Sequence, residues 1–265
     1  MIGSQATGPA RLRLRELSGA AELGEATDLM TEVFGSDEPI AVDLLVAVVC
    51  AGGFVGGAEL DGRLVGVAMA FGEVARPRSD EAPGLHSHVA AVRASARGMR
   101  VGQHLKWYQR RWAMERGIGV IHWTFDPLVR RNAVLNLNRL GAVAAEYHEN
   151  LYGTIPDALN VGMPSDRLLV RWDLDSPRVQ AAAAAASLPP GSPSTSPSPI
   201  SPTPPAIPRV PGTIDTPPDI ERLVAAAPAA AGEWRIRQRA AFAALPEGWV
   251  VTGIDSDGRY EVEQS

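Results

Sequence analysis

The chain has 265 residues, 45% hydrophobic and 21% charged, which is enough to bury one sizeable core, or one core with a small appendage. Its net charge of -5 argues against a dedicated nucleic-acid binder, because such proteins gather Lys and Arg to bind phosphates. Cys50 is the only cysteine, which excludes an intrachain disulfide and favours a reducing, cytoplasmic location. The N-terminus lacks an apolar core and no long apolar run occurs, so we expect neither export nor membrane insertion.

Short apolar strands alternate with helices in the first part of the chain. Hydrophobic spacing predicts a strand over 11–17, helices over 20–34 and 40–49, and strands over 53–60 and 63–71. Asp61-Gly62 joins the last two strands, and both residues tolerate positive φ, which predicts a hairpin. A strand over 85–92 leads directly into a helix over 100–116, which has an apolar stripe of Val101, Leu105, Tyr108 and Trp112.

The later elements end in a proline-rich stretch. A buried strand is predicted over 120–125, a helix over 132–140 ended by Gly141, and strands near 143–151 and 168–173. Twelve of the thirty residues from Pro189 to Pro218 are prolines, a composition that cannot bury enough apolar area to offset the entropy of ordering. We therefore expect an Ala/Pro/Ser-rich disordered linker over 176–218, with the alanines at 181–186 extending a helix into it.

Beyond this linker, residues 219–265 are expected to form a small extension. Residues 220–245 have a helical pattern interrupted at Pro228, and strands at 249–254 and 260–263 flank the turn at Asp257-Gly258. About fifty residues are marginal for independent folding, so the extension should pack back through Trp234 and Phe242. The predicted organisation is a disordered N-terminus over 1–9, a main domain over 10–175, the linker over 176–218 and the extension over 219–265.

The stretch most informative about chemistry connects the strand at 85–92 to the helix that begins near residue 100. Its loop carries Arg97, Gly98, Arg100 and Gly102. Unpaired N–H groups in the first turn of a helix, together with the helix dipole, form an anion site, and the arginines add full charges. These features alone predict a site for any phosphate group. The alternative interpretation is a solvated basic loop that binds no ligand.

The run Arg97-Gly98-Met99-Arg100-Val101-Gly102 resembles the acetyl-CoA signature of the GNAT superfamily, [Q/R]-x-x-G-x-[G/A] at a helix start. Arg100 departs from it, because it stands where the signature has its first glycine. The order of elements over 11–173 also resembles this fold. The resemblance implies an α/β (α+β) protein: a mixed central sheet with splayed parallel strands, flanked by helices, plus the small C-terminal αβ extension. Further runs resemble a bacterial branch of predicted GNAT acetyltransferases that has a C-terminal extension: Trp123 to Pro127, Asn132-Ala133 and Leu140-Gly141-Ala142.

The resemblance implies direct acyl transfer from acetyl-CoA to a primary amine, with no metal. Main-chain groups would bind the pantetheine arm. Loop amides and arginines would bind the pyrophosphate, and an asparagine would contact the CoA arm. The residues at these positions are Ala91 and Val92 for the arm, Arg97, Gly98, Met99, Arg100, Val101 and Gly102 for the pyrophosphate, and Asn132 for the last contact.

Catalytic candidates are fewer. Leu137 stands at the usual position of the tyrosine that protonates the leaving thiolate in many members, so Tyr147 and Tyr152, together with His148, are substitutes for that role. Some members place a glutamate base near the position of His86. A histidine suits the same task, because its unperturbed pKa lies near neutrality.

Several alternatives rank lower. His86, His88, His122 and Asp126 have ligand types suited to a metal, but their spacing is not diagnostic, so we predict no metal. Arg110, Arg111 and Arg116 are expected to lie on a solvated helix face rather than on a nucleic-acid surface. Cys50 has no histidine nearby in sequence and is not assigned as a nucleophile.

The sequence leaves two functional alternatives open. The first is a catalytically degenerate GNAT-fold module that binds acyl-CoA or a protein, favoured by Arg100 and Leu137. The second is a scaffold that uses the proline-rich stretch. If the chain is an enzyme, its partners are acyl-CoA and an amine acceptor, either a small molecule or a protein lysine or N-terminus. We expect no nucleic-acid or membrane partner, and we allow for a homodimer.

Overall fold

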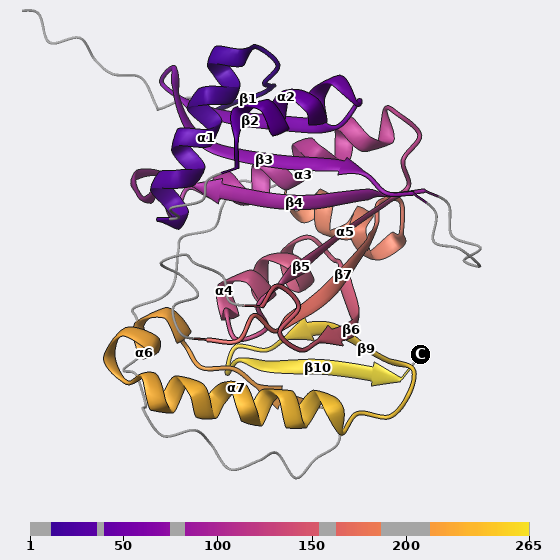
Figure 1. The fold of residues 1–265 in the computed structure, drawn as a ribbon. Helices are drawn as coiled ribbons and strands as arrows, with labels where there is room; N and C mark the ends of the chain where they lie inside the picture. The colour runs from indigo at the N-terminus through magenta and orange to yellow at the C-terminus, as the bar shows by residue number, and fades with distance from the viewer. Residues whose placement is uncertain (1–11, 36–39, 75–82, 154–162, 187–212, 265) are drawn as a thin grey trace, which may run out of the picture.

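The computed structural model describes residues 12–35, 40–74, 83–153, 163–186 and 213–264, and its strands form one sheet (Figure 1). Along the sheet the order is β1-β2-β3-β4-β5-β7-β6-β9-β10-β8. All neighbouring strands are antiparallel except β4 and β5, which are parallel. The strands are β1 Leu12–Glu16, β2 Phe54–Leu60, β3 Arg63–Gly72, β4 Leu85–Val92, β5 Val120–Phe125, β6 Val143–His148, β7 Arg167–Asp173, β8 Thr213–Asp215, β9 Trp249–Ile254 and β10 Arg259–Gln264.

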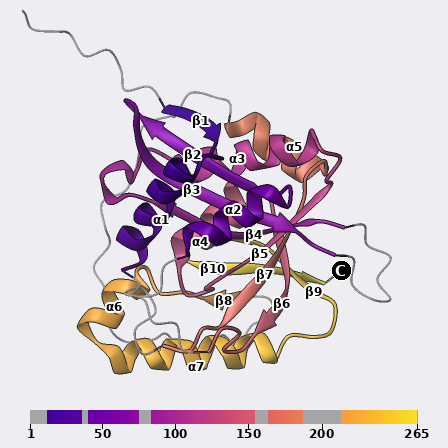
Figure 2. The same cartoon turned by 45° about the horizontal axis from the view of Figure 1, so that its top comes forward.

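Helices cover both faces of the sheet. On one face of β2 to β4, α1 and α2 bury Leu23, Leu29 and Leu45, and α3 buries Leu105 on the other (Figure 2). No helix among the described ranges is long and apolar enough to cross a membrane. The helices are α1 Ala20–Phe34, α2 Val42–Cys50, η1 Ala94–Ala96, α3 Val101–Met114, α4 Arg130–Ala133, η2 Val134–Arg139, α5 Pro177–Ala186, α6 Ile220–Ala226 and α7 Pro228–Ala243.

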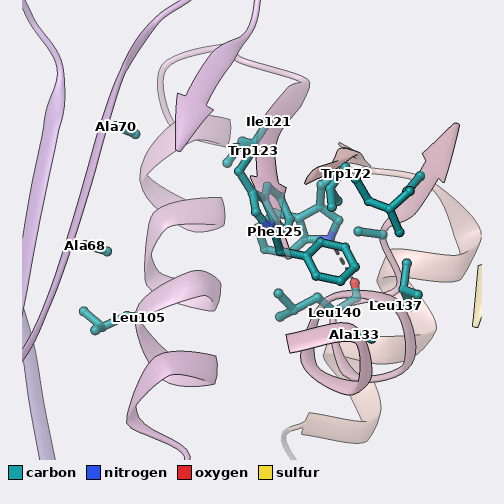
Figure 3. Packing of buried hydrophobic residues seen from close by; sticks show 14 of the residues in the cluster. Ala68, Ala70, Leu105, Ile121, Trp123, Phe125, Ala133, Leu137, Leu140 and Trp172 are labelled. Carbon is teal, nitrogen blue, oxygen red and sulfur yellow. Dashed lines mark hydrogen bonds between the residues drawn. The ribbon is translucent and has the colours of Figure 1, made fainter. Parts of the chain in front are cut away.

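The main core lies between α3, β5 and η2 (Figure 3). At its centre, the ring of Trp172 lies 5.3 Å from that of Trp107 and 5.7 Å from that of Trp123. The indole N–H of Trp172 donates to the carbonyl of Leu140 at 2.8 Å. This bond satisfies a buried donor and ties β7 to the end of η2.

Most predicted elements are present, and the fold class is confirmed. Asp61 and Gly62 have φ of 51° and 80°, the positive values that their hairpin requires. The helix predicted over 132–140 begins earlier, at Arg130, and continues as the π-helical turn η2. There the Leu140 N–H donates to the Leu135 carbonyl, five residues back. Gly141 follows with φ 73°, as expected of a glycine that ends a helix.

Two parts of the stretch 176–218, predicted as linker, have regular structure. Helix α5 occupies Pro177–Ala186, because Val179 buries its side chain fully in the main core and anchors an alanine-rich segment of high helix propensity. Strand β8 at Thr213–Asp215 pairs with β10, which supplies the backbone partners that a short proline-flanked segment needs. Residues 187–212 of the predicted linker lie outside the described residues.

The C-terminal extension continues the sheet. Strand β9 adjoins β6, where Ala144 is paired with Val251. The side-chain amide of Asn138, on η2, donates to the Ile254 carbonyl at 2.7 Å and accepts from the Ile254 N–H at 3.0 Å. One asparagine thus satisfies both polar groups of a strand residue, and it ties η2 to β9. Phe242, on α7, stacks on Tyr147 with ring centroids 4.7 Å apart.

Candidate functional site

The sheet forks between β4 and β5. These parallel strands are paired only where they begin, Leu85 with Ile121 and His86 with His122. Beyond that point they diverge (Figure 1), while β4 stays paired with β3 through Val92 and β5 with β7 through Phe125. In the described structure, the edge of β4 that faces β5 therefore has no strand beside it from Ser87 onward, and the fork opens toward the carboxyl ends of both strands.

A β-bulge in β4 sets the direction of the side chains beside the fork. Met69 pairs with Val89 and Ala70 with Ser87, so His88 is an extra residue without a partner in β3. The bulge places Ser87 on the α3 face, whereas Ala91 packs on the other face with α1. The predicted arm-binding residues Ala91 and Val92 therefore lie on the part of β4 that has diverged from β5.

The loop after β4 presents free backbone donors. We call Arg97 to Gly102 the anion turn. Two of its N–H groups are bonded within the chain, that of Arg97 to the Ala94 carbonyl at 3.2 Å and that of Met99 to the Ala96 carbonyl at 3.3 Å. For the N–H groups of Gly98, Arg100, Val101 and Gly102, the described residues offer no hydrogen-bond acceptor. The Met99 amide, one of the predicted pyrophosphate contacts, is thus bonded to η1, whereas four neighbouring donors are not bonded.

The anion turn has the room and the charge for a diphosphate. The side chains of Arg97 and Arg100 are exposed. A Cβ built on Gly98 would meet no atom within 4 Å, and one on Gly102 would meet only the side chain of Val92, at 3.8 Å. Arg100 has φ 57°, so it adopts the left-handed conformation that a glycine adopts without strain. Gly98 also has positive φ, at 83°, so the turn has two residues in this region of backbone conformation.

Glu73 joins two histidines at the closed end of the fork. Its Oε2 lies 2.6 Å from Nδ1 of His122, and its Oε1 lies 3.5 Å from Nδ1 of His86. Hydrogen bonds from His122 and then from His86 lower the pKa of Glu73 to about 2. The carboxylate thereby orients both rings through Nδ1, which leaves the two Nε2 atoms as proton acceptors. We call Glu73, His86 and His122 the His–Glu–His cluster.

The sequence pointed to one member of this cluster, His86. His122 is a metal-ligand candidate in the sequence, and its place in the predicted strand 120–125 could also have indicated that it lies beside His86. Glu73 gave no signal, because it reaches the cluster only through the end of β3.

An aromatic surface adjoins the cluster. The ring of Phe71 lies 5.1 Å from that of His86 and 5.9 Å from that of His88. The Tyr152 hydroxyl lies 2.9 Å from the Thr124 hydroxyl, on the strand that carries His122. Phe71 and Tyr152 are 38% and 46% exposed, so the surface is open to a second substrate.

The other predicted tyrosine has a different environment. Tyr147 lies two strands away from β5, where its hydroxyl donates to Asp166 at 2.5 Å and its ring stacks on Phe242. Burial and the bond to Asp166 raise its pKa well above the usual range, so it is a poor proton donor at neutral pH. Nε2 of His148 lies 3.4 Å from Glu146. The structure thus places His86 on β4 and the Tyr152 hydroxyl against Thr124 of β5, whereas Tyr147 lies on β6.

Two further sequence candidates have structural partners. Asp126, weighed as a metal ligand, accepts a bond from Arg235 at 2.5 Å. In the described ranges, no three His, Cys, Asp or Glu side chains are grouped so as to hold a metal ion. Arg110, from the predicted solvated basic face, donates to the Leu174 carbonyl at 2.6 and 2.8 Å. Asn132 is half-buried, and its side chain forms no hydrogen bond with the described residues.

A forked mixed sheet whose helix begins at an open anion turn defines an acetyltransferase-type α/β fold. Residues 24–141 match the acetyltransferase (GNAT) family, which supports membership of the GNAT superfamily. No curated protein matches the chain by sequence.

Solved structures show the same fold. The ribosomal-protein-S18-alanine N-acetyltransferase from Escherichia coli aligns with a TM-score of 0.50 and 13% identity, over 63% of this chain and 96% of that one. A protein assigned as an acetyltransferase from Acinetobacter baylyi ADP1 aligns with a TM-score of 0.50 and 18% identity, over 66% and 97%.

Proposed function

We propose that the protein is an N-acyltransferase that transfers an acetyl group from acetyl-CoA to a primary amine. The match to a family of acetyltransferases supports acyl transfer from acetyl-CoA in general. The observation that carries the finer proposal is the anion turn at the mouth of the fork, with four free N–H donors and two exposed arginines.

In this proposal the diphosphate of CoA binds the anion turn, where amides and helix dipole attract negative charge. The guanidinium groups of Arg97 and Arg100 add charge-assisted hydrogen bonds. The pantetheine arm follows the free edge of β4 along Ala91 and Val92, and pairs with it as an added strand would. The side-chain amide of Asn132 provides a further polar contact.

The His–Glu–His cluster then removes the proton from the amine. Nε2 of His86 or His122 accepts this proton, and Glu73 holds the ring and stabilises the imidazolium that forms. The amine nitrogen attacks the thioester carbon directly, so no covalent enzyme intermediate is needed. The exposed rings of Phe71 and Tyr152 offer a surface for the body of the acceptor.

Calorimetric titration of acetyl-CoA tests the CoA site. Arg97→Ala should weaken binding about tenfold, the effect of losing one charge-assisted hydrogen bond. Gly102→Glu should abolish binding, because it places a carboxylate beside the diphosphate in space that is otherwise open. Arg63→Ala removes an exposed arginine at the start of β3 and serves as the matched control. If Gly102→Glu bound acetyl-CoA as tightly as wild type, the proposed site would be wrong.

One observation favours the second candidate, a module that binds acyl-CoA without turnover. Leu137, at the usual position of the general-acid tyrosine, is fully buried in the core. Thiol release from acetyl-CoA with a panel of amines separates the two functions. An enzyme releases CoA thiol only with an acceptor present, whereas a binding module shows CoA-dependent thermal stabilisation and no thiol release.

A further inference from the structure

Lys106 is the only lysine in a chain that has 25 Lys and Arg residues. Its side chain lies on α3 and is only 5% exposed. Lysine is among the residues that are almost never fully buried unless an opposite charge accompanies them. A single buried lysine in an arginine-rich chain therefore requires a specific explanation.

The surroundings of Lys106 are polar but uncharged. Its Nζ donates to the Ser87 hydroxyl, on β4, at 2.7 Å, and to Oε1 of Gln109, on its own helix, at 3.4 Å. On β5 it faces the ring of Trp123, with 3.8 Å between Nζ and the ring centroid. No carboxylate of the described residues lies within ion-pair distance. Burial lowers the pKa of Lys106 to about 7.

These contacts place Nζ at the base of the fork. Ser87 and Trp123 directly follow His86 and His122, the last residues through which β4 and β5 are paired. Ser87 lies about 17 Å along β4 from Val92, which is the strand residue nearest in sequence to the anion turn. In the proposed binding mode, with the diphosphate at the turn and the arm along β4, the thioester would therefore lie at the level of Lys106.

We propose that Lys106 is the general acid of acyl transfer, whose Nζ donates a proton to the CoA sulfur. This inference rests on the proposed function. The amine nitrogen forms a bond to the carbonyl carbon, and the C–S bond breaks with its electron pair going to sulfur. Sulfur takes a proton from Nζ, which leaves CoA thiol and a neutral lysine. The proton lost by the amine goes to the His–Glu–His cluster, and solvent returns a proton to Lys106.

The choice of lysine fits this role. A general acid must release its proton in each cycle, and arginine does not do so in proteins, whereas a buried lysine does. After proton transfer the side chain of Lys106 is neutral, and an uncharged environment stabilises a neutral amine relative to an ammonium ion. The role also supplies the acid that Leu137 cannot supply at the usual position.

Kinetics of three variants provide the first test. Lys106→Met should lower kcat at least a hundredfold, within the usual range for losing an acid, with the acetyl-CoA dissociation constant changed less than about threefold. Lys106→Arg keeps the charge but cannot release its proton, so it should be equally impaired. Arg111→Met removes an exposed cation from the same helix and should keep wild-type kcat. A Lys106→Met variant with kcat within threefold of wild type would overturn the proposal.

A second test needs no turnover. Lysine labelled with ¹³C at the ε-carbon gives one side-chain signal, because Lys106 is the only lysine. Its titration midpoint should lie near pH 7 in the free protein, rise by about one unit with CoA, and stay in place with S-methyl-CoA, which cannot form a thiolate. Equal midpoints with both ligands would refute the contact with sulfur. A protein mass increased by one acyl group on Lys106 would show that the lysine is instead the acceptor.

The outcomes of the two proposals are distinguishable. Absence of acetyl-CoA binding to wild-type protein would refute the proposed function. Normal binding combined with an unresponsive Lys106 signal would refute only the role of Lys106.

Discussion

At the scale of single residues, Arg100 begins α3 with φ 57°, where the superfamily signature has a glycine. A left-handed conformation costs a residue with a Cβ roughly 1 kcal/mol. We predict that Arg100→Gly raises the free energy of unfolding by about that amount, whereas Arg100→Ala, which keeps the Cβ, does not. Urea denaturation of both variants measures the difference. Equal stabilities would mean that the strain is negligible.

Lys106 makes stability depend on pH. Its pKa is about 7 in the folded protein, against 10.5 for an ordinary lysine such as that of the unfolded chain, so the unfolded state binds more protons between these values. Stability therefore rises with pH from about 7 to 10.5, and the penalty is fully present below pH 7. In Lys106→Met this rise of stability with pH should be missing. Thermal unfolding of both proteins across this pH range measures it, and parallel curves would contradict the prediction.

Glu73 makes stability depend on pH in the acid range, where the titrating group is a carboxylate instead of an amine. Its pKa falls from 4.5 to about 2 on folding, so its contribution to stability is present above pH 4.5 and is lost as pH falls toward 2. The carboxylate is a quarter exposed, which keeps this contribution small. Glu73→Gln should flatten the acid limb of the stability curve, as measured by circular dichroism between pH 2 and pH 5. An unchanged limb would show that the histidines do not hold the carboxylate.

The residues of the anion turn could be found in the sequence, but only part of the candidate catalytic surface could be. Arg97, Gly98 and Gly102 are adjacent in sequence, so a local pattern sufficed to find them. Glu73 and His122 meet His86 only because three strands assemble side by side, and a single sequence does not contain that register. The sequence does not predict the burial of Lys106, because Ser87 and Trp123 come next to its side chain only when β4 and β5 are assembled.

At the scale of elements, α7 is held to the core by a buried ion pair. Arg235 is 2% exposed and donates to Asp126 at the end of β5. We predict that Arg235→Met destabilises the protein by up to about 3 kcal/mol, because Asp126 loses its nearer charge partner and keeps only Arg167, 3.8 Å away. Adding Asp126→Asn should recover part of this loss. Chemical denaturation of the single and double variants tests the coupling, and additive effects would argue against it.

Elements that depend on distant partners were the ones that the sequence missed. Strand β8 has three residues, too few for an alternating pattern, and it exists because β10 pairs with it. Helix α5 has Val179 as its buried residue, so its sequence does not show the periodic apolar face by which a packed helix is distinguished from a linker. Long periodic elements such as α1 and α3 were predicted within one or two residues, because their apolar faces are clear in the local sequence.

At the scale of the whole molecule, the extension and the GNAT domain share one sheet and one core. The main cluster of buried residues includes Leu105, on α3, together with Phe242, Val251 and Tyr260 of the extension. We predict a single cooperative thermal transition for the full chain, and aggregation of a chain that ends at residue 186. Calorimetry and size-exclusion chromatography measure these outcomes. Two separate transitions would show that the extension folds independently.

The three-residue strand β8 at the end of the sheet has a consequence for how these molecules behave in a crowded solution. A long exposed edge offers unpaired backbone groups to any passing chain, which then adds itself as the next strand. Here β6 would be such an edge, but β9 and β10 cover it, and the row of strands ends in a segment too short to template another. At this end of the sheet, the extension thus replaces the six-residue edge of β6 with the three-residue edge of β8.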